Sequence, residues 1–383
     1  MGTVVKVIIA GGGTGGHLFP GIAIAEEFQK RGQKNIVLFI GTDRGLEKKA
    51  LREMGFPLRT LDVEGIKGKG FVERGRALLK IPRSLLRSFK IIREFRPDIV
   101  IGVGGYASGP AVITAHFMGV KTAVAEQNVL PGITNRVLGR FVDKVFLTFS
   151  ETRKWFPEKK VLVTGNPIRA AFFSGIRDQG SEVGGQGSGV RGQGEGRREK
   201  GENFTILVFG GSQGAHVINV ALINAVGHLK DMRERLRIIH QTGYNDLEEA
   251  SKVYHVKGIA AEVFPFIMDM ASAFRKADLL ICRAGATTVA EITAMGKTAI
   301  LIPFPFATGD HQTKNAEVLV KAGAAEMIPE KELEGKRLAE VIRRFHRQPE
   351  MVREMEIKSA GLGNVRAATD IVDACMAMVK GLR

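Results

Sequence analysis

Short apolar runs alternate with amphipathic stretches through the first half of the chain. Each run is rich in β-branched residues and has the length of a buried strand, and the stretches between them have helical spacing. The runs that predict strands are 4–10, 36–40, 58–61, 99–102, 121–126, 144–148 and 161–163. The predicted helices are 20–31, 44–54, 74–96, 110–117 and 133–141. Strands that alternate with helices in this way favour a parallel, doubly wound sheet.

The same pattern begins again at Thr205. Strands are predicted at 205–209, 237–241, 259–264, 279–282, 298–302 and 324–328, with helices between them. Helical stretches near 333–346, 350–361 and 364–380 end the chain. Each half opens with a strand, a glycine loop and a helix, so we expect an α/β protein of two Rossmann-like domains. Because such sheets bind ligands at the carboxyl ends of their strands, the two domains are expected to face each other across a cleft.

Residues 174–203 lie between the two halves and differ from both in composition. Ten of these thirty residues are glycine, and only Ile176, Val183 and Val190 are aliphatic. Such a segment cannot bury enough apolar surface to order itself, so we expect a flexible insertion. It is either a spacer at a hinge or a neutral surface loop, and the sequence favours the loop.

The overall composition is that of a globular protein. The 383 residues suit two domains, and 44% of them are hydrophobic and 25% charged. No apolar run reaches the roughly 18 residues that cross a bilayer, and we expect no signal peptide because a strand is predicted from residue 4 onward. The cysteines, Cys282 and Cys375, form no pattern, and Cys282 is expected to be a small core residue. These features favour a cytoplasmic protein.

The net charge of +16 indicates an anionic partner or an adapted surface composition. Nucleic acid is a poor candidate because the chain has three Tyr, one Trp, no zinc-ligand spacing and no basic–aromatic platform. The cations concentrate in the stretch 74–96, which is also apolar and contains Pro82, a residue expected to break or kink the helix. Outward-facing apolar side chains are expected at Leu78, Leu79, Ile81 and Leu85. Such a surface suits an anionic membrane, although an ordinary core-packed helix with a charged outer face has the same pattern.

The first glycine loop follows the first strand and places five glycines in the six positions 11–16. Backbone N–H groups of such a loop, together with a helix N-terminus that Pro20 would begin, can bind an anion. Gly11, Gly13 and Gly16 also satisfy a dinucleotide motif, and the following residues exclude a P-loop. His17 ends the loop. The helix dipole disfavours its protonated form, which suits a general base, but the imidazole could equally bind a backbone group.

The second half of the chain contains the more specific motif for binding a ligand. A Gly-Ala-Thr-Thr turn begins a helix at 285–288, and Glu291 lies one turn further on. The turn can bind a diphosphate and Glu291 can accept both hydroxyls of a ribose, although Thr288 and Glu291 could instead form a capping box. The loop 303–312 displays polar groups suited to sugar hydroxyls, or Asp310 simply caps a helix. The chain has no D-x-D sequence and no histidine pair at ligand spacing, so we expect no metal site and no cofactor.

Six ordered motifs resemble the MurG family, inverting GT-B glycosyltransferases of family 28 that act in bacterial peptidoglycan synthesis. They are Gly12-Gly13-Thr14-Gly15-Gly16-His17, Glu126-Gln127-Asn128, Gly165-Asn166-Pro167-Ile168-Arg169, Gly210-Gly211-Ser212-Gln213-Gly214, Arg283-Ala284-Gly285-Ala286-Thr287-Thr288-Val289-Ala290-Glu291 and Asp310-His311-Gln312. The resemblance covers nearly the whole chain except 174–203. It implies transfer of N-acetylglucosamine from UDP-N-acetylglucosamine to the muramyl 4-hydroxyl of undecaprenyl-linked lipid I, which gives lipid II. A UDP-sugar epimerase on the same scaffold is the alternative.

The resemblance also implies the division of the chain and the residues of the site. An N-terminal acceptor- and membrane-facing domain would span 1–168 plus 364–383, and a C-terminal UDP-sugar domain would span 204–363. The contacts to the UDP-sugar would be Thr14, Gly15, Gly16, Asn128, Arg169, Ser212, Ile267, Ala286, Thr287, Thr288, Val289, Ala290, Glu291 and Gln312. Either His17 or Glu126 would be the base that inversion requires, with His17 preferred. The protein would be peripheral on the cytoplasmic face of the inner membrane.

Overall fold

The computed structural model describes residues 4–12, 15–42, 48, 51–63, 71–173, 203–211 and 213–381, with the backbone alone for 71–80. The predicted helix at 44–54 lies largely outside these residues, and so does almost all of the expected insertion 174–203. The chain divides into two compact units. One comprises Met1–Ala170 with Asn364–Arg383, and the other comprises Ala171–Gly363.

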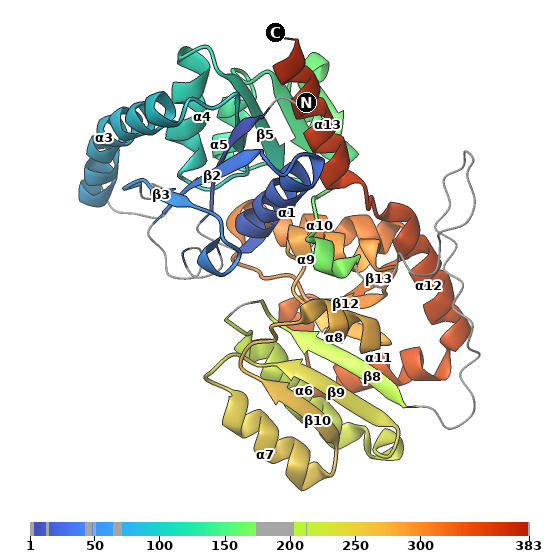
Figure 1. The fold of residues 1–383 in the computed structure, drawn as a ribbon. Coiled ribbons are helices and arrows are strands. Elements are labelled where there is room, and N and C mark those ends of the chain that lie inside the picture. Colours follow the sequence, from blue (N-terminus) through green and yellow to red (C-terminus); the bar gives the residue numbers. More distant parts are fainter. Residues whose placement is uncertain are drawn as a thin grey trace, which may run out of the picture. The chain divides into compact units, whose positions relative to one another are not determined.

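The first unit contains a seven-stranded parallel sheet in the order β3-β2-β1-β4-β5-β6-β7 (Figure 1). Its strands are β1 (Lys6–Ala10), β2 (Ile36–Gly41), β3 (Leu58–Thr60), β4 (Ile99–Gly102), β5 (Lys121–Glu126), β6 (Lys144–Leu147) and β7 (Val161–Val163). Strand order reverses between β1 and β4, which are hydrogen-bonded neighbours. The crevice for a ligand is expected at this switch point.

Helices cover both faces of this sheet. They are α1 (Gly15–Arg31), α3 (Phe71–Phe95), α4 (Ser108–Phe117), α5 (Ile133–Leu138) and α13 (Ala367–Lys380). Val7 and Ile9 of β1 pack with α1 and α13, whereas Ile8 packs with α3, α4 and α5. This alternation follows from the two-residue period of a strand and explains why the buried strands are apolar throughout.

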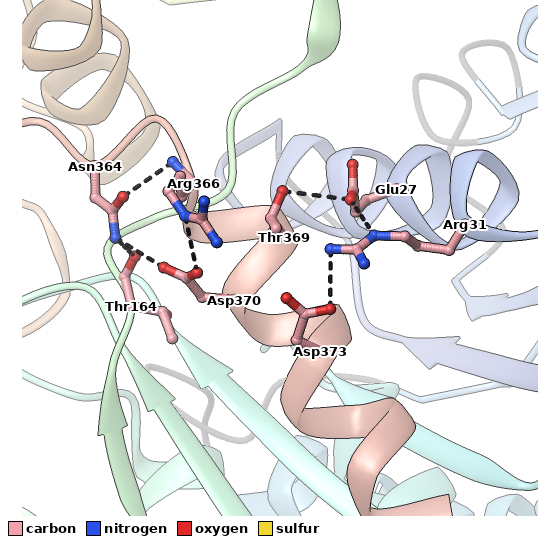
Figure 2. A network of polar contacts seen from close by, with 8 residues as sticks. All are labelled: Glu27, Arg31, Thr164, Asn364, Arg366, Thr369, Asp370 and Asp373. Atoms are coloured by element: carbon pink, nitrogen blue, oxygen red, sulfur yellow. Dashed lines mark hydrogen bonds and ion pairs between the residues drawn. The ribbon is translucent and has the colours of Figure 1, made fainter. Parts of the chain in front are cut away.

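The C-terminal helix α13 belongs to the first unit. Its buried face includes Cys375 and lies in the same core as β1. A polar network then fixes the helix on the surface (Figure 2). Arg31 of α1 pairs with Asp373 at 2.9 Å, and Asn364 donates to the carbonyl of Thr164 at 2.7 Å. These contacts join the end of the chain to α1 and to the segment after β7, both far earlier in the sequence.

The second unit contains a six-stranded parallel sheet in the order β10-β9-β8-β11-β12-β13 (Figure 1). Its strands are β8 (Phe204–Phe209), β9 (Leu236–Gln241), β10 (Ala260–Phe264), β11 (Leu279–Cys282), β12 (Ala299–Leu301) and β13 (Ala325–Met327). Its helices are α6 (His216–His228), α7 (Leu247–Lys257), α8 (Met270–Lys276), α9 (Ala286–Ala294), α10 (His311–Lys321), α11 (Gly335–Arg347) and α12 (Pro349–Leu362). The fold class, two α/β domains each with a parallel sheet, is confirmed.

Both prolines lie inside helices, so the expectations that Pro20 begins a helix and that Pro82 breaks one are wrong. Helix α1 begins at Gly15, so Pro20 lies inside the helix rather than at its start. Helix α3 runs without interruption from Phe71 to Phe95 and contains Pro82. Proline removes one backbone donor and disfavours the helical conformation of the preceding residue, but in these two helices it does not end the helix. Tertiary packing of the remaining helical turns outweighs that local cost.

Candidate functional site

The switch point of the first unit is built from two glycine loops in close contact. Gly11 and Gly12 follow β1, and Gly104 and Gly105 follow β4. A Cβ atom at Gly11 would lie 2.5 Å from the carbonyl oxygen of Gly104, and one at Gly105 would overlap the backbone of Gly12. Gly104 and Gly105 also have φ values of +96° and +81°, which side chains disfavour. Only glycine therefore allows these two strand ends to meet.

His17 lies in the first turn of α1, above these loops, and is half-buried. Its Nδ1 atom is 3.2 Å from Oε1 of Gln127, which directly follows β5. A Cβ at Gly104 would lie 2.6 Å from the same Nδ1 atom, so the glycine backbone packs against the ring. The imidazole is thus held by three segments that are far apart in the sequence.

Glu126, the alternative base, ends β5 and is 2% exposed. Its Oε1 accepts hydrogen bonds from the backbone N–H and the amide of Asn128, at 3.0 and 3.2 Å. Its Oε2 accepts from the backbone N–H of Gly132 at 3.0 Å and from the amide of Asn135 at 2.9 Å. Four donors therefore surround the carboxylate, and they tie the loop after β5 to the start of α5.

The other predicted residues of this unit lie at the same edge of the sheet or near it. Gly15 and Gly16 form the start of α1, and the half-buried Asn128 follows β5. The guanidinium of Arg169 stacks on the ring of Phe19 in α1, with the Arg169 Cζ atom 4.2 Å from the ring centre. Thr14 lies outside the described residues.

Asn166 is a residue that the sequence reasoning placed in a motif but not in the site. It is 3% exposed, and within the described parts of the chain neither atom of its amide has a hydrogen-bond partner. Buried amides are nearly always satisfied, so an unsatisfied one needs an explanation. The sequence feature that could have identified Asn166 as a site residue is its place between Gly165 and Pro167, in a short segment after a strand.

The second unit has a corresponding switch point between β8 and β11. Helix α9 begins there, with Gly285 as its N-cap residue. The capping box of Thr288 and Glu291 is therefore wrong, because Thr288 is the third residue of the helix. Thr287 and Glu291 are 9% and 6% exposed, in the first and second turns of α9. Ala286, Val289 and Ala290 are also buried residues of α9, and Ser212 lies outside the described residues.

Two further predicted residues anchor loops at this edge. The backbone N–H of Ile267 donates to Oε1 of Gln241 at 2.8 Å. The side chain of Gln312 accepts from the backbone N–H of Phe304 at 3.0 Å, which fixes the loop after β12. Asp310 stands at the N-cap position of α10 with φ of +59°, and its carboxylate accepts from the hydroxyl of Thr313 at 2.6 Å.

A buried polar chain supports the adjacent loop after β9. Burial lowers the pKa of His240 to about 4, so its imidazole is neutral at pH 7. Its Nε2 donates to Oδ1 of Asn219 at 3.0 Å, and its Nδ1 accepts from the hydroxyl of Tyr254 at 2.8 Å. The amide of Asn219 then donates to the carbonyl of Thr242 at 2.8 Å. This chain holds Thr242 and Gly243 against the glycine loop at Gly214.

The thiol of Cys282 is fully buried at the end of β11, and burial raises its pKa. It is a core residue, as expected, because a nucleophile needs an accessible thiolate. Within the described ranges, no cluster of three or more His, Cys, Asp or Glu side chains could hold a metal ion. In that same part of the chain, no helix is both long and apolar enough to span a bilayer.

Two family models match the sequence of this chain. The glycosyltransferase family 28 N-terminal domain matches residues 7–147, and the family 28 C-terminal domain matches residues 205–373. Together they cover most of the chain. The protein therefore belongs to glycosyltransferase family 28.

Relatives refine this assignment. A protein of Syntrophus aciditrophicus is 60% identical over 98% of this chain and 99% of its own length, and it carries the name UDP-N-acetylglucosamine--N-acetylmuramyl-(pentapeptide) pyrophosphoryl-undecaprenol N-acetylglucosamine transferase. The crystal structure of Acinetobacter baumannii MurG is 30% identical, with a TM-score of 0.75 over 97% of this chain and 99% of that one. Within family 28, the chain thus groups with the MurG transferases.

A UDP-GlcNAc 2-epimerase from Neisseria meningitidis, solved with UDP-GlcNAc bound, is also similar in structure. Its TM-score is 0.63 over 97% of this chain and all of that one, at 13% sequence identity. Identity this low shows a shared fold alone. The epimerase alternative therefore gains no support beyond the scaffold.

Proposed function

We propose that the protein transfers N-acetylglucosamine, with inversion, from UDP-N-acetylglucosamine to the muramyl 4-hydroxyl of undecaprenyl-linked lipid I, giving lipid II. Such a reaction serves peptidoglycan synthesis, and through it cell-wall growth, cell shape and division. The observation that carries the proposal is the 60% identity, over nearly the full length of both chains, to a relative named for this transfer. No cofactor and no nucleic acid take part.

The first unit supplies the groups for the acceptor in this proposal. Inversion at the anomeric carbon needs one displacement and a base for the acceptor hydroxyl. His17 is that base, because its imidazole lies at the strand ends where ligands of such sheets bind. Glu126 organises the loop that carries Asn128, since its two carboxylate oxygens already accept four hydrogen bonds.

The second unit binds the donor in this proposal. The first turn of α9 offers backbone N–H groups and a helix dipole to the diphosphate, and Glu291 accepts the ribose hydroxyls. Ser212, Ile267 and Gln312 supply further contacts. Helix N-termini and Arg169 balance the charge of the UDP leaving group, so no fixed metal is needed.

The decisive experiment measures UDP release by the purified protein with UDP-N-acetylglucosamine and a soluble lipid I analogue. We expect release only when both substrates are present, and a disaccharide product in equal amount. Consumption of the UDP-sugar without the acceptor, with the sugar isomerised, would instead identify an epimerase. Absence of thermal stabilisation by UDP-N-acetylglucosamine would count against both enzymes, because a bound ligand must stabilise the fold.

Replacing Glu291 by Gln should weaken donor binding about 30-fold. The substitution removes a charge from hydrogen bonds to two hydroxyls, which costs about 2 kcal/mol. Isothermal titration with UDP measures the effect. The matched control is Glu249→Gln on α7, an exposed position whose substitution should leave affinity unchanged. Equal affinities in the two variants would remove Glu291 from the ribose site.

We also propose that α3 holds the protein on the anionic cytoplasmic face of the inner membrane. The described side chains of α3 form a buried face and an exposed face. Ser84 and Ser88 are buried, whereas Ile81, Leu86 and Phe89 are 38%, 65% and 41% exposed. The exposed cations Arg83 and Arg87 lie between these apolar residues in the sequence, and the exposed Lys90 follows Phe89. The outward surface is therefore both basic and apolar, although Leu85 is half-buried and the side chains of Leu78 and Leu79 lie outside the described set.

Changing Leu86 and Phe89 together to Ser should reduce binding to anionic vesicles about 30-fold. Partial insertion of two large apolar side chains contributes about 2 kcal/mol. Vesicle sedimentation measures binding, and UDP affinity should not change. A double variant with Val256→Ser and Ile357→Ser, also exposed apolar positions, is the control. Vesicle binding that is equal in both variants would exclude α3 as the membrane contact.

A further inference from the structure

The side chain of Gln127 has a defined orientation. Gln127 is 1% exposed, and its Nε2 donates to the backbone carbonyl of Ala125 at 3.1 Å. A carbonyl oxygen can only accept, so the amide nitrogen must face Ala125 and the amide oxygen must face away from it. That oxygen, Oε1, is the atom 3.2 Å from Nδ1 of His17.

This orientation determines which nitrogen of His17 carries the proton. Because Oε1 of Gln127 can only accept, Nδ1 must be the donor and Nε2 keeps its lone pair. The ring cannot easily turn away, since the backbone of Gly104 packs against Nδ1 and Cε1. The neutral imidazole is therefore held as one tautomer by groups at the ends of β4 and β5.

We propose that Gln127 is a positioning residue that keeps Nε2 of His17 ready as the base, an inference that rests on the proposed function. In the transfer, Nε2 takes the proton of the acceptor hydroxyl. The oxygen of that hydroxyl forms a bond to the anomeric carbon of the donor sugar at the same time. The bond from that carbon to the phosphate oxygen breaks, and UDP leaves with the electron pair. The imidazolium then has both nitrogens protonated, and Oε1 of Gln127 still accepts from Nδ1, so the contact persists through the step.

Nitrogen NMR of the ¹⁵N-histidine-labelled protein tests the tautomer without any substrate. The His17 signals are assigned by their loss in His17→Asn. We expect a protonated Nδ1 and an unprotonated Nε2 at pH 8 in the wild type.

In Gln127→Met, which keeps the length of the side chain but has no acceptor, we expect a mixture of tautomers. In Gln127→Glu, which keeps an acceptor oxygen, the wild-type tautomer should persist. A wild-type His17 protonated on Nε2, or unchanged tautomers in Gln127→Met, would overturn the proposal.

Steady-state kinetics supply the second test. Gln127→Met should lower kcat at least 10-fold with an unchanged KM for UDP-N-acetylglucosamine, and Gln127→Glu should recover most of this loss. The same change at exposed Gln33, Gln33→Met, should have no effect. An unchanged kcat in a folded Gln127→Met would also overturn the proposal. If the wild type makes no disaccharide, the proposed function fails, whereas the NMR result still decides the tautomer.

Discussion

Replacing His17 by Asn lowers kcat about 1,000-fold and leaves the affinity for UDP-N-acetylglucosamine unchanged. A positioned base contributes roughly 10²- to 10⁴-fold to a reaction of this kind. The Asn side chain can place its amide nitrogen where Nδ1 lies and keep the hydrogen bond to Gln127, but it has no atom at the Nε2 position. The substitution thus removes the base while the contact at 3.2 Å, which orders the loop, is retained.

Single-turnover rates with saturating donor and acceptor measure this loss, because they separate chemistry from binding. Thermal stabilisation by UDP-N-acetylglucosamine serves as the control for folding and donor binding. A rate within threefold of the wild type would exclude His17 as the base. The role would then pass to Glu126, the other candidate.

Replacing Glu126 by Gln should destabilise the first unit by about 3 kcal/mol. Each carboxylate oxygen accepts two hydrogen bonds. Whichever oxygen becomes an NH₂ group, two buried donors then face a donor, and each unsatisfied donor costs about 1–3 kcal/mol. The effect is large because Glu126 is 2% exposed and water cannot replace the lost acceptor.

Urea unfolding followed by the fluorescence of Trp155 measures this change. Trp155 is the only tryptophan and lies in the first unit, at the end of the 3₁₀ helix Ser150–Trp155, so its signal reports that unit. The control is Glu158→Gln, an exposed position where we expect less than about 0.5 kcal/mol. Wild-type stability combined with a 1,000-fold loss of kcat would show instead that Glu126 is the base.

The two candidate bases illustrate how far sequence reasoning extends. Glu126 ends a predicted strand and His17 ends the glycine loop before a predicted helix, so their place at the carboxyl edge of the sheet could be predicted from periodicity. Their different roles could not, because the four donors around Glu126 come from the loop after β5 and from α5, and no local pattern specifies how these two segments meet the carboxylate. For the same reason, Gln127 could be placed in the motif Glu126-Gln127-Asn128 but could not be given a role. Its function depends on a contact with a residue 110 positions earlier.

For the surface of helix α3, too, the sequence predicted one part of the result and the tertiary structure decided the rest. The sequence indicated a basic, apolar helix, and the helix is present. Which apolar residues face outward was only partly predicted: Ile81 is exposed, but Leu86 and Phe89 are the larger exposed pair beyond it. The small residues Ser84 and Ser88 are buried together with Ile91 and Ile92, so apolar side chains alone do not mark the buried face of this helix.

By itself, the sequence determined the two parallel sheets, the order of the strands along the chain, the glycine loops and the family. These depend on local periodicity and on short motifs, which need no knowledge of distant contacts. Only the tertiary structure decided where α1 begins, that α3 continues through Pro82, which carboxylate is enclosed by donors, and which nitrogen of His17 holds the proton. Each of these depends on packing and hydrogen bonds between segments far apart in the chain, and such contacts override local preference.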